Sequence, residues 1–308
     1  MAQQNEKEED PVQEYFFANY RLLTEESIAS RRSARDLANF TAPMPYTHTF
    51  QVREGDAKDV DAKRAWALGC PVAFEYESYT VHDTDGGWAF VCKPEGGRPA
   101  KWIHSLVLCS RDYSDMTVYA SGMKTPDGRS GASGMTLDLL RMAVNACIYR
   151  HDGLVLHASL VEKDGFGVVF LGPSGVGKST QAKLWEQVLG AEYLSEDRPC
   201  LRQIGGEWYG FGMPWWGNEI FRQDSVPVRA LVLLSQAKEN RIEPMNPAQT
   251  LAALLKQVIL PVWDKATMNA ITVQLAALAL ERPFYHFYCQ PDAAAVRLAC
   301  ETIQGVSV

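Results

Sequence analysis

The sequence predicts an α+β protein in which a C-terminal core, a mixed sheet with flanking helices, follows a smaller, mixed and β-rich N-terminal domain. Three observations predict this fold. Short β-prone runs separated by turn dipeptides fill residues 47–123. A glycine-rich loop at Gly172–Thr180 follows an apolar strand and precedes a helical stretch. The remaining chain contains further short strands and then mostly helical sequence, up to a strand at Phe284–Cys289.

The sequence divides into a tail and two domains. The stretch Met1–Asp10 is polar and charged, so residues 1–12 are expected to form a disordered tail. Residues 13–150 are expected to form the N-terminal mixed α/β domain, for which the sequence predicts no role. Residues 151–308 are expected to form the glycine-loop domain.

The N-terminal domain is expected to hold an antiparallel sheet with helical flanks. A helix is predicted from Thr24 to about Leu37, because acidic residues follow its first position. A second helix is predicted at Leu137–Tyr149 from its apolar stripe. The predicted strands and turns are Pro71–Thr80, Trp88–Cys92, Trp102–Ser110 and Met116–Ser121, with turns at Asp85-Gly86 and Gly96-Gly97.

The second domain has a clearer pattern. A strand at Leu154–Glu162 and a strand at Gly167–Leu171 flank a turn at Asp164-Gly165. A helix is predicted from Lys178 to Leu189, ending at Gly190. The other predicted elements are a strand at Tyr193-Leu194, a hairpin at Leu201–Phe211 around Gly205-Gly206, and strands at Arg229–Leu234 and Phe284–Cys289.

Composition argues against several classes of protein. The 308 residues carry a formal net charge of −7 and no basic stripe, so no nucleic-acid partner is expected. Apolar stretches such as Leu251–Val262 are shorter than the roughly 20 residues that span a bilayer, so no membrane partner is expected. The 7 cysteines are scattered and form no CxxC pair. The scattered cysteines, together with the lack of a signal-like apolar run at the start, predict reduced thiols and a cytoplasmic protein. A nucleophilic Cys109 or Cys200 is a minor alternative.

Within the loop Gly172–Thr180, residues Gly172–Ser179 fit the pattern G-x-x-x-x-G-K-[ST] at every defined position. Glycines let backbone N–H groups converge on phosphate oxygens, and the following helix presents its positive end to the same anion. Lys178 is expected to reach the β- and γ-phosphates, and Ser179 to bind Mg²⁺. The predicted nucleotide-binding residues are Gly172, Ser174, Gly175, Val176, Gly177, Lys178, Ser179 and Thr180.

Acidic residues are expected near this loop. Most proteins with such a loop place a metal-linked Asp after an apolar strand, but Ala230–Leu234 is followed by Ser235-Gln236. The pair Glu196-Asp197, one helix and one strand beyond Lys178, is the better candidate; the alternative is a solvated turn. His157 is the third candidate, with a structural strand histidine as its alternative.

Together these residues resemble the HPr kinase/phosphorylase family, whose catalytic core is shared with phosphoenolpyruvate carboxykinases. The resemblance runs from about Gly153 to the C-terminus, and the first ~150 residues carry none. It rests on Leu156–Ser159, the glycine loop, Leu194–Arg198, Met213–Gly217, and Pro283–Cys289 with Gln290-Pro291-Asp292. In that family two aspartates follow the loop helix, whereas this chain has Glu196 in the first position.

The resemblance implies an ATP- and Mg²⁺-dependent kinase acting on a hydroxyl, with a peptide or protein serine as the acceptor. A small-metabolite kinase and a nucleotide-gated binding protein are the alternatives. The resemblance implies that the catalytic residues are Asp197, Glu196, His157 and Lys178. It also implies that the metal is bound by Ser179, Glu196 and Asp197. Arg198 or Arg222 is a candidate to steady the transferred group, with a surface salt bridge as the alternative. Trp215 and Trp216 are candidates for a wall of the acceptor cleft, with loop packing as the alternative. Because family members commonly assemble, a homo-oligomer is also implied.

Overall fold

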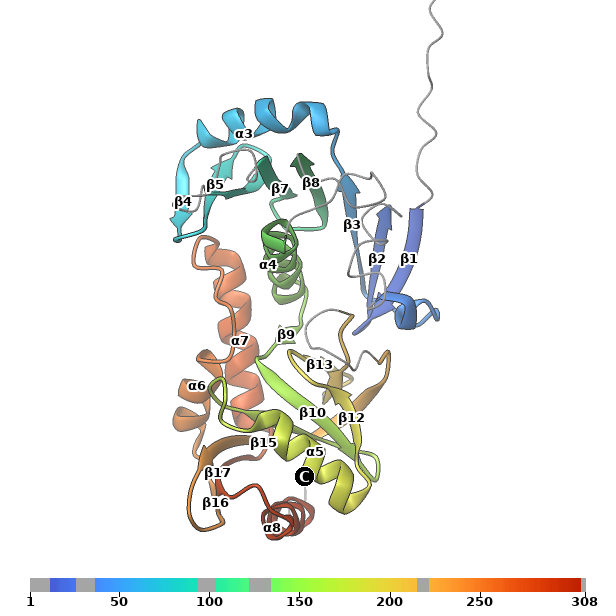
Figure 1. Ribbon diagram of the computed structural model, residues 1–308, viewed down its shortest axis with the longest axis vertical. Coiled ribbons are helices and arrows are strands. Elements are labelled where there is room, and N and C mark those ends of the chain that lie inside the picture. Colours follow the sequence, from blue (N-terminus) through green and yellow to red (C-terminus); the bar gives the residue numbers. More distant parts are fainter. Residues whose placement is uncertain (1–11, 26–36, 94–103, 122–133, 215–221, 306–308) are drawn as a thin grey trace, which may run out of the picture. The chain divides into compact units, whose positions relative to one another are not determined.

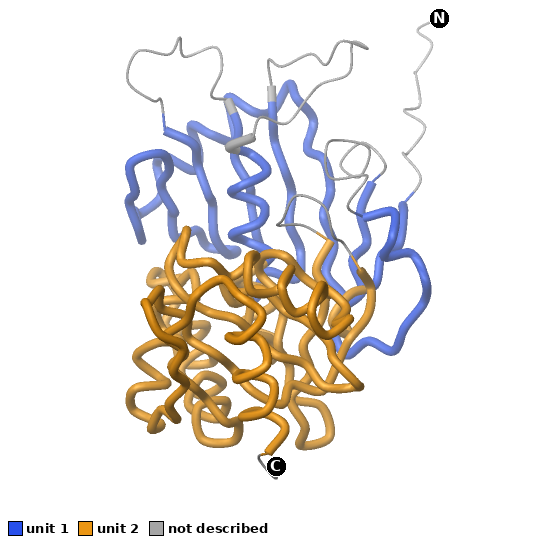
Figure 2. Tube along the Cα trace, turned by 60° about the horizontal axis from the view of Figure 1, so that its bottom comes forward, with its two compact units in different colours: residues 1–16, 20–144 blue, residues 17–19, 145–308 orange. Residues whose placement is uncertain are grey.

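The structure is a computed structural model that describes residues 12–25, 37–93, 104–121, 134–214 and 222–305. The chain forms two compact units (Figure 2), one of residues 1–16 and 20–144 and the other of residues 17–19 and 145–308. The division falls inside helix α4 (Gly134–Arg150). The sequence placed the domain boundary at the end of that helix.

The first unit is built on one sheet of eight strands in the order β1-β2-β3-β8-β7-β6-β5-β4 (Figure 1). Helix α3 (Val60–Leu68) packs its buried Val60 and Ala67 against Ala89, Val91 and Leu106 of this sheet. The strands are β1 (Val12–Phe17), β2 (Tyr20–Glu25), β3 (His48–Glu54), β4 (Val72–Glu75), β5 (Tyr79–Thr84), β6 (Gly87–Cys92), β7 (His104–Ser110) and β8 (Asp115–Ser121), with 3-10 turns at Ala38–Phe40 and Ala57–Asp59.

The expected antiparallel sheet is wrong for part of this unit. The strands from β4 to β8 pair antiparallel with their neighbours. However, β3 pairs parallel with both β2 and β8, so the sheet is mixed. These pairings join segments far apart in the chain, and no local turn signal announces them. The helix expected to begin at Thr24 is also wrong at its start, because Thr24 and Glu25 end β2; residues 26–36 lie outside the described residues.

The second unit contains a nine-stranded sheet in which β12-β10-β11-β15-β14-β13-β9 follow one another and β17 pairs with β15 and β16. Its strands are β9 (Leu154–Val155), β10 (Ala158–Lys163), β11 (Phe166–Leu171), β12 (Glu192–Ser195), β13 (Cys200–Ile204), β14 (Glu207–Phe211), β15 (Ser225–Gln236), β16 (Arg241–Pro244) and β17 (Phe284–Cys289). Its further helices are α5 (Lys178–Leu189), α6 (Pro247–Leu255), α7 (Lys265–Glu281) and α8 (Ala293–Gln304).

Three neighbouring strands of this sheet run parallel. Strand β15 pairs parallel with β11 on one side and with β17 on the other. Helices α5 and α8 bury residues such as Trp185 and Val296 in one core cluster, together with Phe170 of β11 and Phe287 of β17. Because the carboxyl ends of parallel strands meet at one edge of a sheet, the loops after β11, β15 and β17 gather there.

Most elements expected in this unit are present, with α5 and β17 at the predicted residues. One expectation is wrong where it affects the site: Leu154–Glu162 is not one strand. The chain leaves the sheet at Leu156 and His157, whose backbone N–H groups donate to Pro199 O (3.2 Å) and Gln257 O (2.7 Å). Among the described residues, no helix is both long and apolar enough to cross a membrane.

Candidate active site

The glycine loop connects the end of β11 to the first residue of α5. Gly172, Gly175 and Gly177 take φ angles of 142°, 77° and 113°, a region that other residues rarely adopt. A Cβ added to Gly175 or Gly177 would meet no atom within 4 Å. The loop therefore has the backbone freedom to curve around an anion and open space beside its crest. Ser174 and Thr180 are exposed, and Val176 is half-buried.

Lys178 begins α5 and lies back over the loop. Its ammonium donates to Gly172 O (2.9 Å) and Pro173 O (3.2 Å), and the residue is buried, with 8% of its surface exposed. Burial lowers the pKa of Lys178, while the nearby Asp197 carboxylate opposes that effect. The loop thus holds a cation whose partners are neutral carbonyl oxygens.

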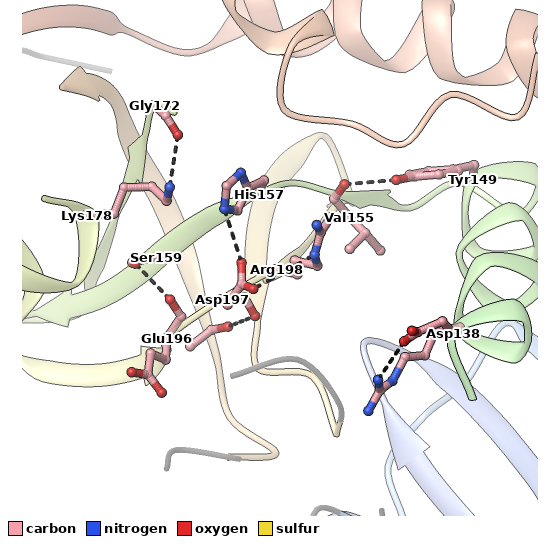
Figure 3. A network of polar contacts seen from close by, with 12 residues as sticks. Asp138, Tyr149, Val155, His157, Ser159, Gly172, Lys178, Glu196, Asp197 and Arg198 are labelled. Atoms are coloured by element: carbon pink, nitrogen blue, oxygen red, sulfur yellow. Dashed lines mark hydrogen bonds and ion pairs between the residues drawn. The ribbon is translucent and has the colours of Figure 1, made fainter. Parts of the chain in front are cut away.

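Asp197 and His157 face each other across the turn that follows β12 (Figure 3). His157 Nε2 lies 3.9 Å from Asp197 Oδ1, and each side chain is about one-third exposed, at 31% and 34%. Arg198 Nε lies 3.9 Å from the other carboxylate oxygen, Oδ2. Asp197 Oδ1 is buried, and within the part of the chain that the structure describes it accepts no hydrogen bond. A buried, unbonded carboxylate oxygen can accept a proton or bind a cation.

Backbone bonds hold the acid turn against β10. Ser159 Oγ donates to Glu196 O (2.9 Å), and Ser195 Oγ donates to Asp197 O (3.1 Å). Arg198 N donates to Ala158 O (3.1 Å), and Arg198 has a φ of 58°, a left-handed conformation uncommon outside glycine. This bend belongs to the turn after β12, which ends at Ser195, and the same turn places Asp197 beside His157.

Glu196 does not join this pair. Its carboxylate points away from Asp197 and His157 along the turn (Figure 3). Burial raises the pKa of Tyr193, and both Glu196 and Asp197 act in the same direction. The structure therefore brings Lys178, His157 and Asp197 together and places Glu196 on the other side of the turn.

The charges of this site act on one another. Burial lowers the pKa of His157 first, the Lys178 ammonium and Arg198 lower it further, and Asp197 opposes them. His157 is consequently neutral near pH 7. A neutral imidazole beside a carboxylate can accept or relay a proton, which is a catalytic and not a structural role.

We predict that His157 makes the stability of the protein depend on pH. Its pKa in the folded state lies below the unfolded value of about 6.5. Between these two values the unfolded chain binds more protons, so stability that is present above about pH 6.5 is lost as the pH falls toward the folded pKa. The melting temperature of His157→Asn minus that of wild type should therefore be about 1–3 °C higher at pH 5 than at pH 8. A difference that is the same at both pH values would contradict this.

Gln236 is a contact of the loop that the sequence analysis missed. It ends β15 and donates from Nε2 to Gly175 O and Val176 O, both at 3.4 Å. A planar peptide places the N–H opposite its C=O, so a contact to Val176 O also helps to fix the direction of Gly177 N–H. The parallel register of β11 and β15, which brings Leu171 beside Leu233, could have pointed to this contact.

The other candidates lie elsewhere or outside the described residues. Arg222 pairs with Glu192 (2.8 Å) and Asp224 (3.0 Å), which leaves Arg198 as the arginine beside Asp197. Trp215 and Trp216 lie outside the described residues. All seven cysteines are free. Burial raises the pKa of Cys200 to about 12 and that of Cys109 further, which makes both poor nucleophiles.

The residues present fit a polyphosphate and a divalent cation. Left-handed glycines with open space beside them suit phosphate oxygens, and α5 directs its N-terminus to the same place. The unbonded oxygen of Asp197 and the hydroxyl of Ser179 are the hard oxygen ligands that Mg²⁺ prefers. The arrangement can therefore bind an anion and act on a proton beside it.

Comparisons with a family model and with solved structures find similar proteins. A family model described as "SynChlorMet cassette protein ScmC" matches residues 132–280. Among solved structures, the chain is similar to the Hpr(Ser) kinase/phosphatase from Coxiella burnetii, at 15% identity and a TM-score of 0.29, over 48% of this chain and 92% of that one. No match is found among curated proteins. The glycine loop and the acid turn both lie within the span that the ScmC family model matches.

Proposed function

We propose that this protein is an ATP- and Mg²⁺-dependent phosphotransferase that moves the γ-phosphoryl group to a hydroxyl, with a peptide or protein serine as the acceptor. One observation carries the proposal: the Lys178 ammonium on the glycine loop and the His157–Asp197 pair form a single charged cluster. The loop supports nucleotide binding, and the pair supports chemistry on the acceptor.

In this proposal the loop binds and orients the phosphates. The amides of Gly175, Gly177 and Lys178 would donate to phosphate oxygens, and the Lys178 ammonium would exchange its carbonyl partners for them. Ser179 would hold Mg²⁺ together with an acid of the turn that carries Glu196 and Asp197. Mg²⁺ supplies charge neutralisation of the phosphates when bound.

Asp197 would accept the proton of the acceptor hydroxyl. As the oxygen–phosphorus bond to the acceptor forms, the bond to the bridging oxygen of ADP breaks and ADP leaves with that oxygen. The neutral His157 would orient Asp197 and take part in moving the proton. Arg198 and Lys178 would stabilise the negative charge of the transferred group.

Transfer of a labelled phosphate tests this function. The full chain is incubated with γ-labelled ATP, Mg²⁺ and candidate acceptors: serine peptides, products of neighbouring genes and small hydroxylated metabolites. The expected result is a gain of one phosphate on a serine, detected by mass spectrometry, that is absent with Asp197→Asn. Phosphate on a metabolite alone would assign the acceptor to the small-molecule class. Nucleotide binding with no transfer and no ATP turnover would exclude a phosphotransferase.

A further inference from the structure

Tyr193 is a buried residue of β12 that none of the steps above uses. It pairs with Val161 of β10, and 4% of its surface is exposed. Its ring belongs to the core cluster that also contains Ala182 and Trp185 of α5. Tyr193 therefore lies between the edge of the sheet and the helix that follows the glycine loop.

The hydroxyl of Tyr193 is buried, and among the described residues it has no hydrogen-bond partner. Buried hydroxyls normally have one, because an unpaired polar group inside a protein costs stability. Phenylalanine would fill the same space without that cost. A function of the hydroxyl would account for the tyrosine.

Two serine hydroxyls lie next to it. Ser179 precedes Ala182 by three residues on α5, so both lie on the face of the helix that covers Tyr193. Ser159 precedes Val161 by two residues on β10, so both lie on the same face of the sheet. In agreement, these two hydroxyls lower the pKa of Tyr193, against the larger effect of burial, which raises it.

The proton of Ser159 fixes the direction of any bond with Tyr193. Ser159 Oγ already donates to Glu196 O (2.9 Å), and a serine hydroxyl has a single proton. In a hydrogen bond with Tyr193, Ser159 Oγ can therefore only be the acceptor. A Tyr193 hydroxyl that donates to Ser159 keeps its own lone pairs, which can accept a hydrogen bond from Ser179.

We propose that Tyr193 is a positioning residue of the metal site, through a hydroxyl chain in which Ser179 donates to Tyr193, Tyr193 to Ser159, and Ser159 to Glu196 O. The inference rests on the proposed function, because it concerns how Ser179 meets a cation. With its proton directed at Tyr193, Ser179 presents only lone pairs to the opposite side, as a metal ligand must. The chain also links the glycine loop to the turn that carries Glu196 and Asp197.

The Mg²⁺ dependence of nucleotide binding tests the chain. Affinity for a non-hydrolysable ATP analogue is measured by calorimetry over a range of Mg²⁺ concentrations for wild type and Tyr193→Phe. We expect equal affinities without Mg²⁺. The Mg²⁺ concentration that gives half of the gain in affinity should rise about three- to ten-fold in the variant, the range for one hydrogen bond.

Stability and a matched variant complete the test. The melting temperature of Tyr193→Phe should stay close to that of wild type, because phenylalanine fills the same space and removes only a buried hydroxyl. Tyr285→Phe makes the same change in the same core, where Tyr285 is 6% exposed, and should leave the Mg²⁺ dependence unaltered. An unaltered Mg²⁺ dependence in Tyr193→Phe would overturn the chain alone. Wild type that binds no nucleotide with or without Mg²⁺ would overturn both the chain and the proposed function.

Discussion

Replacing Asp197 by Asn is expected to lower phosphoryl transfer by about 10²–10⁴-fold, the range for loss of a general base. The oxygen that accepts no hydrogen bond in the structure belongs to this residue, and an amide cannot take up a proton. Because Asn keeps the shape and one oxygen ligand, nucleotide affinity should stay within about three-fold of wild type. Transfer of labelled phosphate and calorimetric affinity are the two measurements.

Two further variants separate Asp197 from acids in general. Asp224→Asn removes an exposed carboxylate that pairs with Arg222 and should leave transfer unaltered. Glu196→Gln should cost less than Asp197→Asn, because the Glu196 carboxylate points away from His157. If Glu196→Gln had the larger effect, the roles of the two acids would be reversed.

The variant Asp197→Asn also leads to a spectroscopic prediction. The Asp197 carboxylate raises the pKa of His157 against burial and the Lys178 ammonium. Its removal should therefore lower the pKa of His157, which an NMR titration of the imidazole protons would follow. An unaltered pKa would show that the two side chains do not interact across 3.9 Å.

Replacing Lys178 by Met is expected to weaken ATP binding by about 10- to 100-fold, since hydrogen bonds to a charged group contribute about 1.5–3 kcal/mol each. The melting temperature of the protein without nucleotide should not fall. Burial lowers the pKa of Lys178, which means that the folded protein disfavours this cation. Calorimetry with an ATP analogue and thermal unfolding measure the two effects.

Lys183→Met is the matched control on the same helix, where Lys183 is exposed. It should change neither the affinity nor the melting temperature. Equal losses of affinity in the two variants would mean that nucleotide binding responds to the overall charge of α5. The proposed contact between the ammonium and the phosphates would then be wrong.

Local patterns were enough to predict the helix and the strand on either side of the glycine loop. The helix Lys178–Leu189 was predicted at its observed residues from the glycine loop before it and Gly190 after it, and both Gly177 and Gly190 are left-handed in the structure. The strand before the loop was expected at 167–171 and begins one residue earlier, at Phe166. Alternation and glycine punctuation depend on neighbours in the chain, so sequence reasoning captures them well.

Contacts between distant segments could not be predicted in this way. Leu156 and His157 leave the strand because Pro199 and Gln257 accept their N–H groups, although the alternation of side chains continues through them. The parallel pairing of β3 with β8 joins residues more than 60 positions apart. Gln236 and Tyr193 were missed for the same reason, since neither residue type suggests a role until its neighbours in space are known.

The two carbonyl oxygens that accept from Lys178 have a consequence for turnover. A buried ammonium left without acceptors when a product departs would slow that departure. Here Gly172 and Pro173 offer the ammonium a place to return to within the same loop. In the proposed reaction, arrival and release would then be exchanges of one set of oxygen acceptors for another, which would let firm binding of polyphosphate go together with quick release.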